Sequence, residues 1–282
     1  TASANANFGI NLIYRVEPVL PLTAGTTATD KVYDGSNNVA VVLSPGSHTT
    51  TFDGDTYVFN FDGGVGQGSA ASAHVGCWSV VVAPTSASVT AGTLGSCVSG
   101  YGNVSFAGLT VNITPAALTA TVGNFSKVYG TNDGLFTYTL SGLQGTDTMA
   151  GVMTGRLGRQ TGENVGNYAL TNGSLASNGD YALTINLGGA KESITPTNLT
   201  VTGVNTSKTY GTSDPGPAFT TAVLVNGVVQ GYDTNGNLVN VTLADTVANS
   251  LTGSLGRQAG ESVGNYAYTL GSLGLASGNA SG

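Results

Sequence analysis

Short stretches in which apolar and polar residues alternate recur along the whole chain. The clearest are LTATV, FTYTL, NYALT and YALTINL, and glycine or asparagine separates one from the next. A period of two places alternate side chains on opposite faces of an extended backbone, so each stretch predicts a short β-strand. A single helical turn is expected over 147–153 and over 245–251, where Asp147 and Asp245 are placed to cap it. The pattern predicts an all-β fold.

The order of these segments is repeated. NITPAALTATVGNFSKVYGTNDG begins at Asn112, and SITPTNLTVTGVNTSKTYGTSDP begins at Ser193. Further on, GRQTGENVGNYAL at 158–170 returns as GRQAGESVGNYAY at 256–268. Near-copies at such spacings indicate repeated structural units rather than two halves of one active centre.

The later copy contains extra residues between these two matches. The surplus lies within VLVNGVVQGYDTNGNLVN, residues 223–240, where apolar and polar residues alternate around two Asn-Gly pairs. Asn-Gly between alternating segments is a strong hairpin signal. Because the flanking segments are nearly the same in both copies, an inserted β-hairpin is expected outside the shared core.

A more diverged copy comes first. RVEPVLPLTA at 15–24 and DKVYDGSNN at 30–38 parallel the later copies, whereas the region around Trp78 does not. These matches predict β-sandwich-like (Ig-like) modules in an extended array, joined at prolines that stiffen the chain. The predicted parts are an N-terminal strand segment (1–18) and three repeats: the first (19–115), the second (116–196) and the third (197–282), which carries the hairpin and lacks a last strand.

Composition narrows the function. Only 8% of the 282 residues are charged, 43 are glycine, and the formal net charge is −7. The few Lys and Arg residues are scattered, so nucleic acid is not an expected partner. A membrane-spanning helix needs about 18 apolar residues in a row, and the sequence has no such run.

Candidate chemistry is sparse. Asp53, Asp55 and Asp62 lie close together in the sequence and are a weak candidate for calcium binding, although their spacing does not match an EF-hand loop. DTNGN at 233–237 is better explained as a hairpin turn. His48 and His74 belong to no recognisable catalytic motif, and Glu163 and Glu261 lie in separate repeats. We expect no enzymatic activity, and no cofactor other than this calcium.

The repeats share further residues with two readings each. One set is the tyrosines Tyr33, Tyr129, Tyr168, Tyr210 and Tyr266. They could form platforms on which glycans stack, or they could pack within the fold with their hydroxyls bonded to the backbone. The second interpretation is favoured. Trp78 is a lectin-like candidate or, beside Cys77, a core residue. Lys127 and Lys208 either form ion pairs with Glu163 and Glu261, which we favour, or an amide bond to an asparagine.

The repeat motifs resemble two known families. KVYDG is similar to the YDG module, and SKVYG, SKTYG and GxxVGNY resemble the YGX-type MBG module. Both occur in tandem in very large bacterial surface and secreted proteins, including filamentous-haemagglutinin-like adhesins. The resemblance implies an extracellular location and a stalk or fibre role without catalytic residues. The alternative is a binding module, in which the first repeat or the hairpin recognises a glycan or a host protein.

The two ends of the sequence are complementary. The third repeat lacks a counterpart of YALTINL, while ANANFGINLIYRVEP near the N-terminus resembles it. Residues 5–16 are therefore expected to complete the third repeat of another copy, head to tail, or to adjoin further modules of a longer chain. The side chains expected to fill the open sheet are Phe8, Ile10, Leu12 and Tyr14.

Cys77 and Cys97 are predicted to form a structural disulfide within the first repeat, since the sequence has no CxxC motif or Cys/His cluster that would favour zinc. Closing a loop of this size stabilises a domain by about 3 kcal/mol. Mass spectrometry of the non-reduced protein should recover the linked peptides, and reduction should lower the free energy of unfolding. Two free thiols in freshly isolated extracellular protein would contradict the pairing.

Overall fold

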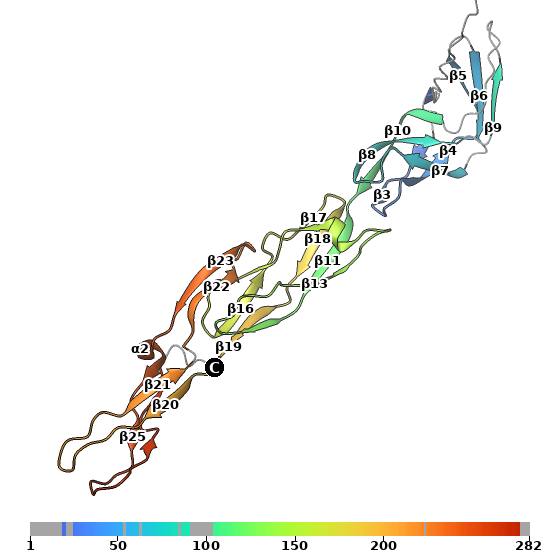
Figure 1. The fold of residues 1–282 in the computed structure, drawn as a ribbon. Helices are drawn as coiled ribbons and strands as arrows, with labels where there is room; N and C mark the ends of the chain where they lie inside the picture. The colour runs from blue at the N-terminus through green and yellow to red at the C-terminus, as the bar shows by residue number, and fades with distance from the viewer. Residues whose placement is uncertain are drawn as a thin grey trace, which may run out of the picture. The chain divides into compact units, whose positions relative to one another are not determined.

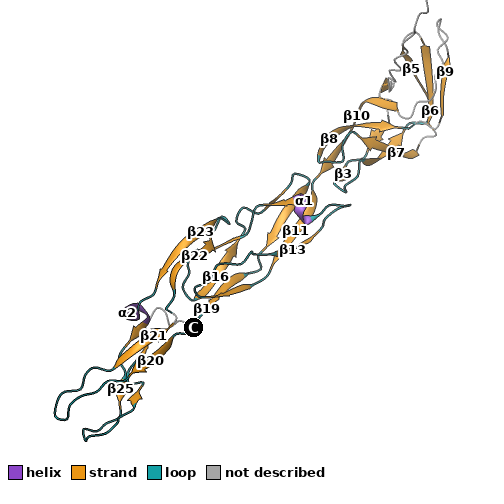
Figure 2. Cartoon of the chain, in the orientation of Figure 1, coloured by secondary structure: helices purple, strands orange, loops and turns teal. Residues whose placement is uncertain are grey.

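The computed structural model describes residues 19–20, 25–52, 55–61, 64–83, 86–90, 104–222 and 224–276. The chain divides into two compact units. The first comprises Thr1–Ala117, Gln144–Asp147 and Gly179–Ala182, and the second comprises the remaining residues. Nearly all regular structure is strand (Figure 2), which confirms the predicted all-β class. The division into three β-sandwich-like modules stays a prediction.

The first unit contains a large, mostly antiparallel sheet and a smaller one (Figure 1). The large sheet has the order β1 (Val19–Leu20), β10 (Val104–Thr114), β8 (Gly76–Val82), β7 (Gly64–Ala70), β4 (Asn38–Leu43) and β2 (Thr27–Ala28), and β3 (Lys31–Val32) pairs with β10. The smaller sheet is β5 (Gly46–Phe52), β6 (Asp55–Phe61) and β9 (Ser86–Thr90). Alternate residues such as Val39 and Val41 point into the core, as a period of two requires.

The second repeat forms two main sheets. One is β13 (Tyr138–Ser141), β11 (Ala116–Val122) and β18 (Tyr181–Asn186). The other is β12 (Phe125–Val128), β19 (Lys191–Thr195), β16 (Gly166–Thr171) and β15 (Gly158–Arg159), with β14 (Met153–Thr154) and β17 (Ala176–Ser177) paired separately. Leu118, Ala120 and Val122 of β11 and Ile194 of β19 are buried. The four strands quoted from the sequence are thus confirmed.

The described part of the third repeat is less paired. Its two-stranded sheets are β20 (Thr200–Val204) with β21 (Ala218–Ala222), β22 (Asn226–Tyr232) with β23 (Leu238–Ala244), β24 (Leu251–Thr252) with β27 (Gly274–Leu275), and β25 (Gly256–Arg257) with β26 (Tyr268–Thr269). Residues 206–209 correspond to β12 but are not strand. The reason is that β12 pairs in parallel with β19, and no described residue of the third repeat takes the place of β19.

The two predicted helical turns are present, but their caps differ from the expectation. In α1 (Met149–Val152) and α2 (Val247–Ser250), the threonines that precede them, Thr148 and Thr246, accept the capping hydrogen bonds. Asp147 and Asp245 stand one residue earlier and do not cap. The threonine hydroxyl suffices as a cap acceptor, so each aspartate carboxylate can bind elsewhere.

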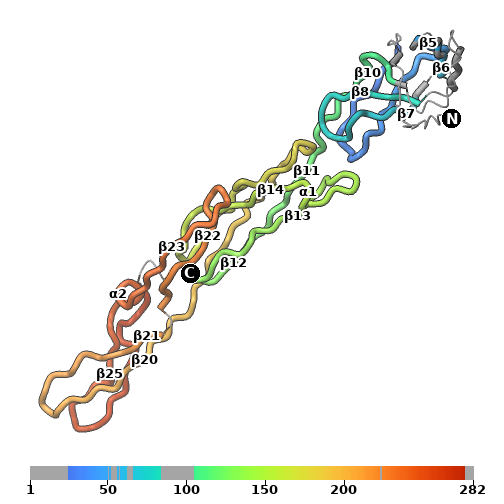
Figure 3. Tube along the Cα trace, turned by 45° about the horizontal axis from the view of Figure 1, so that its top comes forward, coloured from blue at the N-terminus to red at the C-terminus, as the bar shows by residue number. Residues whose placement is uncertain are grey.

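The predicted hairpin is confirmed, apart from residue 223, which lies outside the described residues. β22 and β23 pair from Asn226↔Ala244 to Tyr232↔Leu238. In the turn, Asp233 Oδ1 accepts hydrogen bonds from the backbone N–H groups of Asn235 and Asn237, each at 2.8 Å, so DTNGN forms a turn as expected. The hairpin lies along β15 and β16 of the second repeat (Figures 1 and 3).

Several predicted residues lie outside the described part of the chain. These are the strand residues Phe8, Ile10, Leu12 and Tyr14, the calcium candidates Asp53 and Asp62, and Cys97. Asp55 begins β6. Cys77 is an exposed free thiol in β8. The disulfide is not shown, and both it and the calcium site stay predictions.

Candidate functional site

A cluster of five charged side chains is buried in the second repeat. Lys127 Nζ lies 2.6 Å from Asp133 Oδ1 and also pairs with Glu163. Arg159, with 0% of its surface exposed, donates from Nε to Asp133 Oδ2 at 2.7 Å and pairs with Glu163 through Nη2. Glu192 of β19 completes the cluster. The lysine is therefore in ion pairs, as favoured from the sequence, and these pairs are buried.

The thirteen-residue segment 158–170, which contains Arg159, binds the Arg159 guanidinium through its own backbone and through Tyr168. Arg159 Nη1 donates to the carbonyl oxygens of Gln160 (2.9 Å) and Gly162 (2.7 Å). The guanidinium carbon lies 5.1 Å from the ring centroid of Tyr168, whose hydroxyl donates to the Asn164 carbonyl oxygen. Gly162 has φ 143°, and a Cβ there would lie 2.3 Å from the Tyr168 ring. The repeated signature is therefore structural.

The charges in the cluster do not balance, because three carboxylates face two cations. The single N–H of Arg159 Nε is donated to Asp133, so Glu192 Oε2, also 2.7 Å from Nε, receives no hydrogen bond. Burial and the neighbouring Asp133 raise the pKa of Glu192 to about 7. Burial also acts to raise the pKa of Asp133, but hydrogen bonds from Arg159 and Lys127 outweigh it and hold that pKa below its usual value.

The hairpin of the third repeat covers this cluster with its main chain. The backbone N–H of Tyr232 donates to Asp133 Oδ2 at 2.8 Å, and the Asp133 N–H donates to the Gln230 carbonyl oxygen at 2.8 Å. The Arg159 N–H donates to the Asp233 carbonyl oxygen at 3.1 Å. Between these contacts, Gly231 lies directly over the charges, and a Cβ there would be 2.4 Å from Glu163 Oε1. Only glycine allows this approach.

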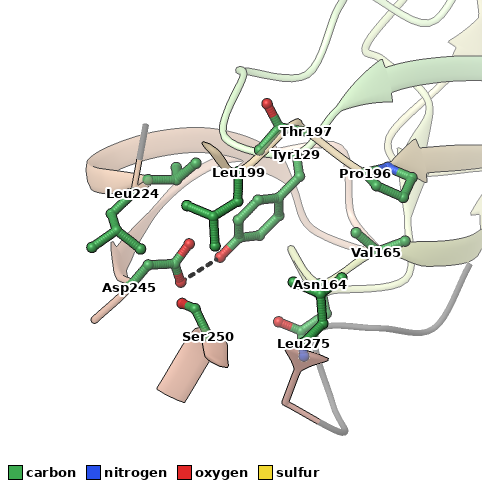
Figure 4. Close-up of a pocket in the computed structure, with 11 residues that line it drawn as sticks. Tyr129, Asn164, Val165, Pro196, Thr197, Leu199, Leu224, Asp245, Ser250 and Leu275 are labelled. Carbon is green, nitrogen blue, oxygen red and sulfur yellow. Dashed lines mark hydrogen bonds between the residues drawn. The ribbon is translucent and has the colours of Figure 1, made fainter. Parts of the chain in front are cut away.

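A second kind of contact links one repeat to the next through a tyrosine. The Tyr33 hydroxyl donates to Asp147 Oδ2, and the Tyr129 hydroxyl donates to Asp245 Oδ1, each at 3.0 Å (Figure 4 shows the second). In both cases, burial and then the aspartate raise the pKa of the tyrosine to about 12. Each acceptor is the aspartate that precedes a helical cap. Sequence reasoning placed these tyrosines inside the fold but missed their partners; the Asp-Thr pair in each repeat was the available signal.

A small cavity lies beside the Tyr129–Asp245 hydrogen bond. Its volume is about 80 Å³, and its lining includes Leu199, Leu224 and Leu275 (Figure 4). Pockets for drug-sized ligands are typically about 300–1,000 Å³. The cavity is therefore a packing space at the joint and not a ligand site.

The first unit contains further contacts near the Tyr33–Asp147 hydrogen bond. His74 Nδ1 lies 2.7 Å from Asp180 Oδ2, a partner that the sequence did not reveal. The Trp78 indole N–H donates to the His74 carbonyl oxygen at 2.7 Å, and the side chain is half-buried rather than in the core.

In the second and third repeats, the hydroxyls of Tyr168 and Tyr266 donate to backbone oxygens, as expected from the favoured interpretation of the tyrosines.

Four of these five charged side chains have counterparts in the third repeat, Lys208, Asp214, Arg257 and Glu261, and there the ion pairs are more exposed. Arg257 Nε donates to Asp214 Oδ2 at 2.7 Å, and Lys208 Nζ lies 2.5 Å from Glu261 Oε2. Hydrogen bonds from Arg257 and Lys208 lower the pKa of Asp214 to about 2. The Glu261 side chain is 67% exposed, against 4% for its counterpart Glu163. Tyr210, the counterpart of Tyr129, is 73% exposed.

Comparison with known proteins identifies one part of the chain. The family model of the MBG domain (YGX type) matches residues 118–189. This confirms the resemblance for the second repeat, and domains of this family occur in secreted and surface adhesin-like proteins. The YDG resemblance of the first repeat stays a prediction. No curated protein and no solved structure matches the chain. Neither helix in the described residues has the length and apolar character needed to cross a bilayer.

We predict that Glu192 makes stability depend on pH near neutrality. A carboxyl whose pKa rises from 4.5 to about 7 on folding takes up a proton, so its contribution is present below the unfolded pKa and is lost as pH rises through the folded pKa. The free energy of unfolding should fall by about 2–3 kcal/mol between about pH 5 and pH 7.5. Glu192→Gln should flatten this slope in urea titrations, whereas Glu261→Gln, in the exposed cluster, should not. An unchanged slope in Glu192→Gln would contradict the assignment.

Gly231→Ala is predicted to loosen the hairpin from the second repeat. The added Cβ would meet Glu163 Oε1 at 2.4 Å and Arg159 Nη2 at 2.8 Å, inside a cluster that cannot easily shift. A loss of about 1–3 kcal/mol in urea unfolding is expected. Gly274→Ala is the matched strand control, because a Cβ there meets nothing within 4 Å. Equal losses of stability in the two variants would argue against a close contact between Gly231 and the buried charges.

Proposed function

We propose that this chain is a structural element of an extracellular fibre or adhesin stalk and that it has no catalytic role. The observation that carries the proposal is the use of its buried charges. Lys127, Asp133, Arg159 and Glu163 are paired with one another and covered by the main chain of the following repeat. Such an arrangement holds repeats together and leaves no group directed at a substrate.

Two further observations support a stalk role. The family match places the second repeat among domains of secreted and surface adhesin-like proteins. The tyrosine-to-aspartate contact is made twice, by Tyr33 and by Tyr129, so the same connector is used at successive joints. A repeated connector suits a protein whose task is to extend and transmit load.

The finer proposal is head-to-tail assembly through residues 5–16. In the second repeat, β11 has neighbours on both edges, β13 and β18. Its counterpart β20 pairs with β21 only, within the strands that the structure describes. An open strand edge presents unpaired N–H and C=O groups that another strand can satisfy. We propose that residues 5–16 of a neighbouring copy pair there, with Phe8, Ile10 and Leu12 on one face.

The test is electron microscopy of negatively stained protein with and without residues 1–16. The full chain should form filaments, and the truncated chain should not. Deleting residues 1–4 alone is the matched control and should leave filaments intact. A synthetic peptide of residues 5–16 should block filament growth of the full chain, whereas a scrambled peptide should not. Ordinary filaments from the chain lacking residues 1–16 would show that this segment is not the connector.

A further inference from the structure

The hairpin of the third repeat has one edge that binds the second repeat and one that does not. Across the hairpin, the Asp233 N–H donates to the Asn237 carbonyl oxygen at 2.9 Å, and the Asp245 N–H donates to the Val225 carbonyl oxygen at 3.2 Å. Hydrogen-bonded and non-hydrogen-bonded pairs alternate along an antiparallel ladder. The odd-numbered residues of β22 and β23 are therefore bonded to each other, and the even-numbered residues turn their N–H and C=O groups outward.

On β22 these outward groups bind the second repeat. The Gln230 N–H donates to Asn132 Oδ1 and the Tyr232 N–H donates to Asp133 Oδ2, each at 2.8 Å. The Gln230 carbonyl oxygen accepts from the Asp133 N–H at 2.8 Å. The outer edge of β22 is thus bonded within the chain.

The outward groups of β23 belong to Leu238, Asn240, Thr242 and Ala244. The Ala244 carbonyl oxygen accepts from Asn249 Nδ2 at 3.1 Å. The outward main-chain groups of the other three meet no partner within the residues that the structure describes, since β23 pairs there with β22 alone. The outer side of β23 is therefore an open strand edge.

The sequence of this edge does not protect it from other strands. Proteins usually guard open edges with charged side chains, prolines or bulges, because an unpaired edge binds other strands. From residue 224 to residue 244 the sequence has no proline, and Asp233 is its one charged residue. The Asp233 carboxylate is occupied in the hairpin turn. The pairing of β22 with β23 runs from end to end without a bulge, so the edge is regular and uncharged.

The exposed face of the hairpin indicates which strand fits this edge. At its centre, Gln230 Nε2 donates to Asn240 Oδ1 at 3.3 Å, so the two amides form a row across the hairpin. Apolar side chains lie on either side of this row, with Val228 62% exposed and Leu238 48% exposed. The face is complementary to a copy of itself, because an amide row then meets an amide row with apolar positions on both sides.

A two-fold axis at Asn240 brings two such edges into register. With the β23 strands of two copies antiparallel, Asn240 lies opposite the partner's Asn240, and Leu238 lies opposite the partner's Thr242. These are the residues whose outward main-chain groups are open, so each pair exchanges N–H···O=C hydrogen bonds. Ala244 is not needed and keeps its bond to Asn249. The amide row continues across both hairpins, and such cross-strand amide rows stabilise neighbouring strands.

We propose that β23 pairs with β23 of a second copy of this chain in this antiparallel register and joins the two hairpins into one continuous sheet. The self-matching amide row selects a second copy as the partner, and the lack of positive charge gives nucleic acid no attachment. A two-fold contact closes after two copies, so it pairs chains side by side and does not lengthen a stalk. The contact is independent of residues 5–16 and of the head-to-tail proposal.

Disulfide trapping in the full chain tests the partner and the register. Hydrogen-bonded antiparallel residues have Cα atoms about 5.5 Å apart, a distance that a disulfide spans. Mild oxidation of Asn240→Cys should give covalent dimers, and peptide mass spectrometry should find position 240 joined to position 240. A mixture of Leu238→Cys and Thr242→Cys chains should cross-link faster than either variant alone.

Thr184→Cys, at an exposed position of β18, is the matched control and should form no such dimer. Peptide mapping separates these links from any that involve Cys77 or Cys97. The absence of 240–240 links at the highest soluble concentration, or links from position 240 to other segments only, would overturn the proposal.

Charge exchange at the same position tests the two-fold symmetry. Asn240→Lys and Asn240→Glu should each weaken association in sedimentation velocity about tenfold, because like charges then face each other across the axis. Mixing the two variants should restore association, since lysine then faces glutamate. Thr184→Lys should leave association unchanged. Equal association of the wild-type chain and both variants, or no recovery on mixing, would show that β23 does not pair with itself.

Electron microscopy of the full chain separates this proposal from head-to-tail assembly. Filaments that depend on residues 1–16 but show no 240–240 link would leave the head-to-tail proposal standing and overturn this one. A 240–240 link in protein that forms no filaments would support the β23 contact and count against head-to-tail assembly. Where both contacts form, filaments should lie in pairs, and Asn240→Lys should leave them single.

Discussion

The buried guanidinium of Arg159 is the constraint on which the rest of the second unit depends. A charge removed from water costs several kcal/mol unless its partners are close and well oriented. Arg159 meets this requirement with two carboxylates, two carbonyl oxygens and an aromatic ring. All of these partners except Asp133 belong to the segment from Gly158 to Tyr168, which contains β15, the following loop and the start of β16, and this accounts for its near-identical copy in the third repeat. The third repeat supplies the rest of the burial, because its hairpin covers the charges with main-chain groups. The buried charges of the second repeat therefore depend on the third repeat for part of their hydrogen bonding.

The two copies of the cluster show what burial adds. The hydrogen bonds from Arg257 to the carbonyl oxygens of Gln258 and Gly260 have the same lengths as those from Arg159 to Gln160 and Gly162, so this part of the arrangement forms without a covering hairpin. Exposed ion pairs contribute little because water and salt screen them. Once the hairpin of the next repeat excludes water, the same pairs interact more strongly, and breaking one leaves an uncompensated buried charge. Covering by a neighbour therefore converts a weak surface cluster into a joint that resists separation.

The tyrosine contacts add direction to these joints. Each hydroxyl comes from the start of one repeat, and each carboxylate comes from the residue before a helical cap in the next. Because the threonine accepts the capping hydrogen bond, the aspartate carboxylate is available to accept from the tyrosine of the preceding repeat. A donor at one end and an acceptor at the other make the repeat unit polar, so repeats can be joined in only one order.

The sequence by itself determined the all-β class, the strands of the second repeat, the hairpin and the MBG resemblance. These follow from alternation, Asn-Gly turns and repetition, which act over a few residues. Tertiary structure alone decided that Asp147 and Asp245 accept from tyrosines more than 100 residues away, and that the hairpin covers the second repeat. The pairing of His74 with Asp180 was hidden for the same reason. Local propensity determines which segments form strands. A buried polar group instead needs a hydrogen-bond partner, and here that partner comes from a residue far away in the sequence, so no local sequence pattern identifies it.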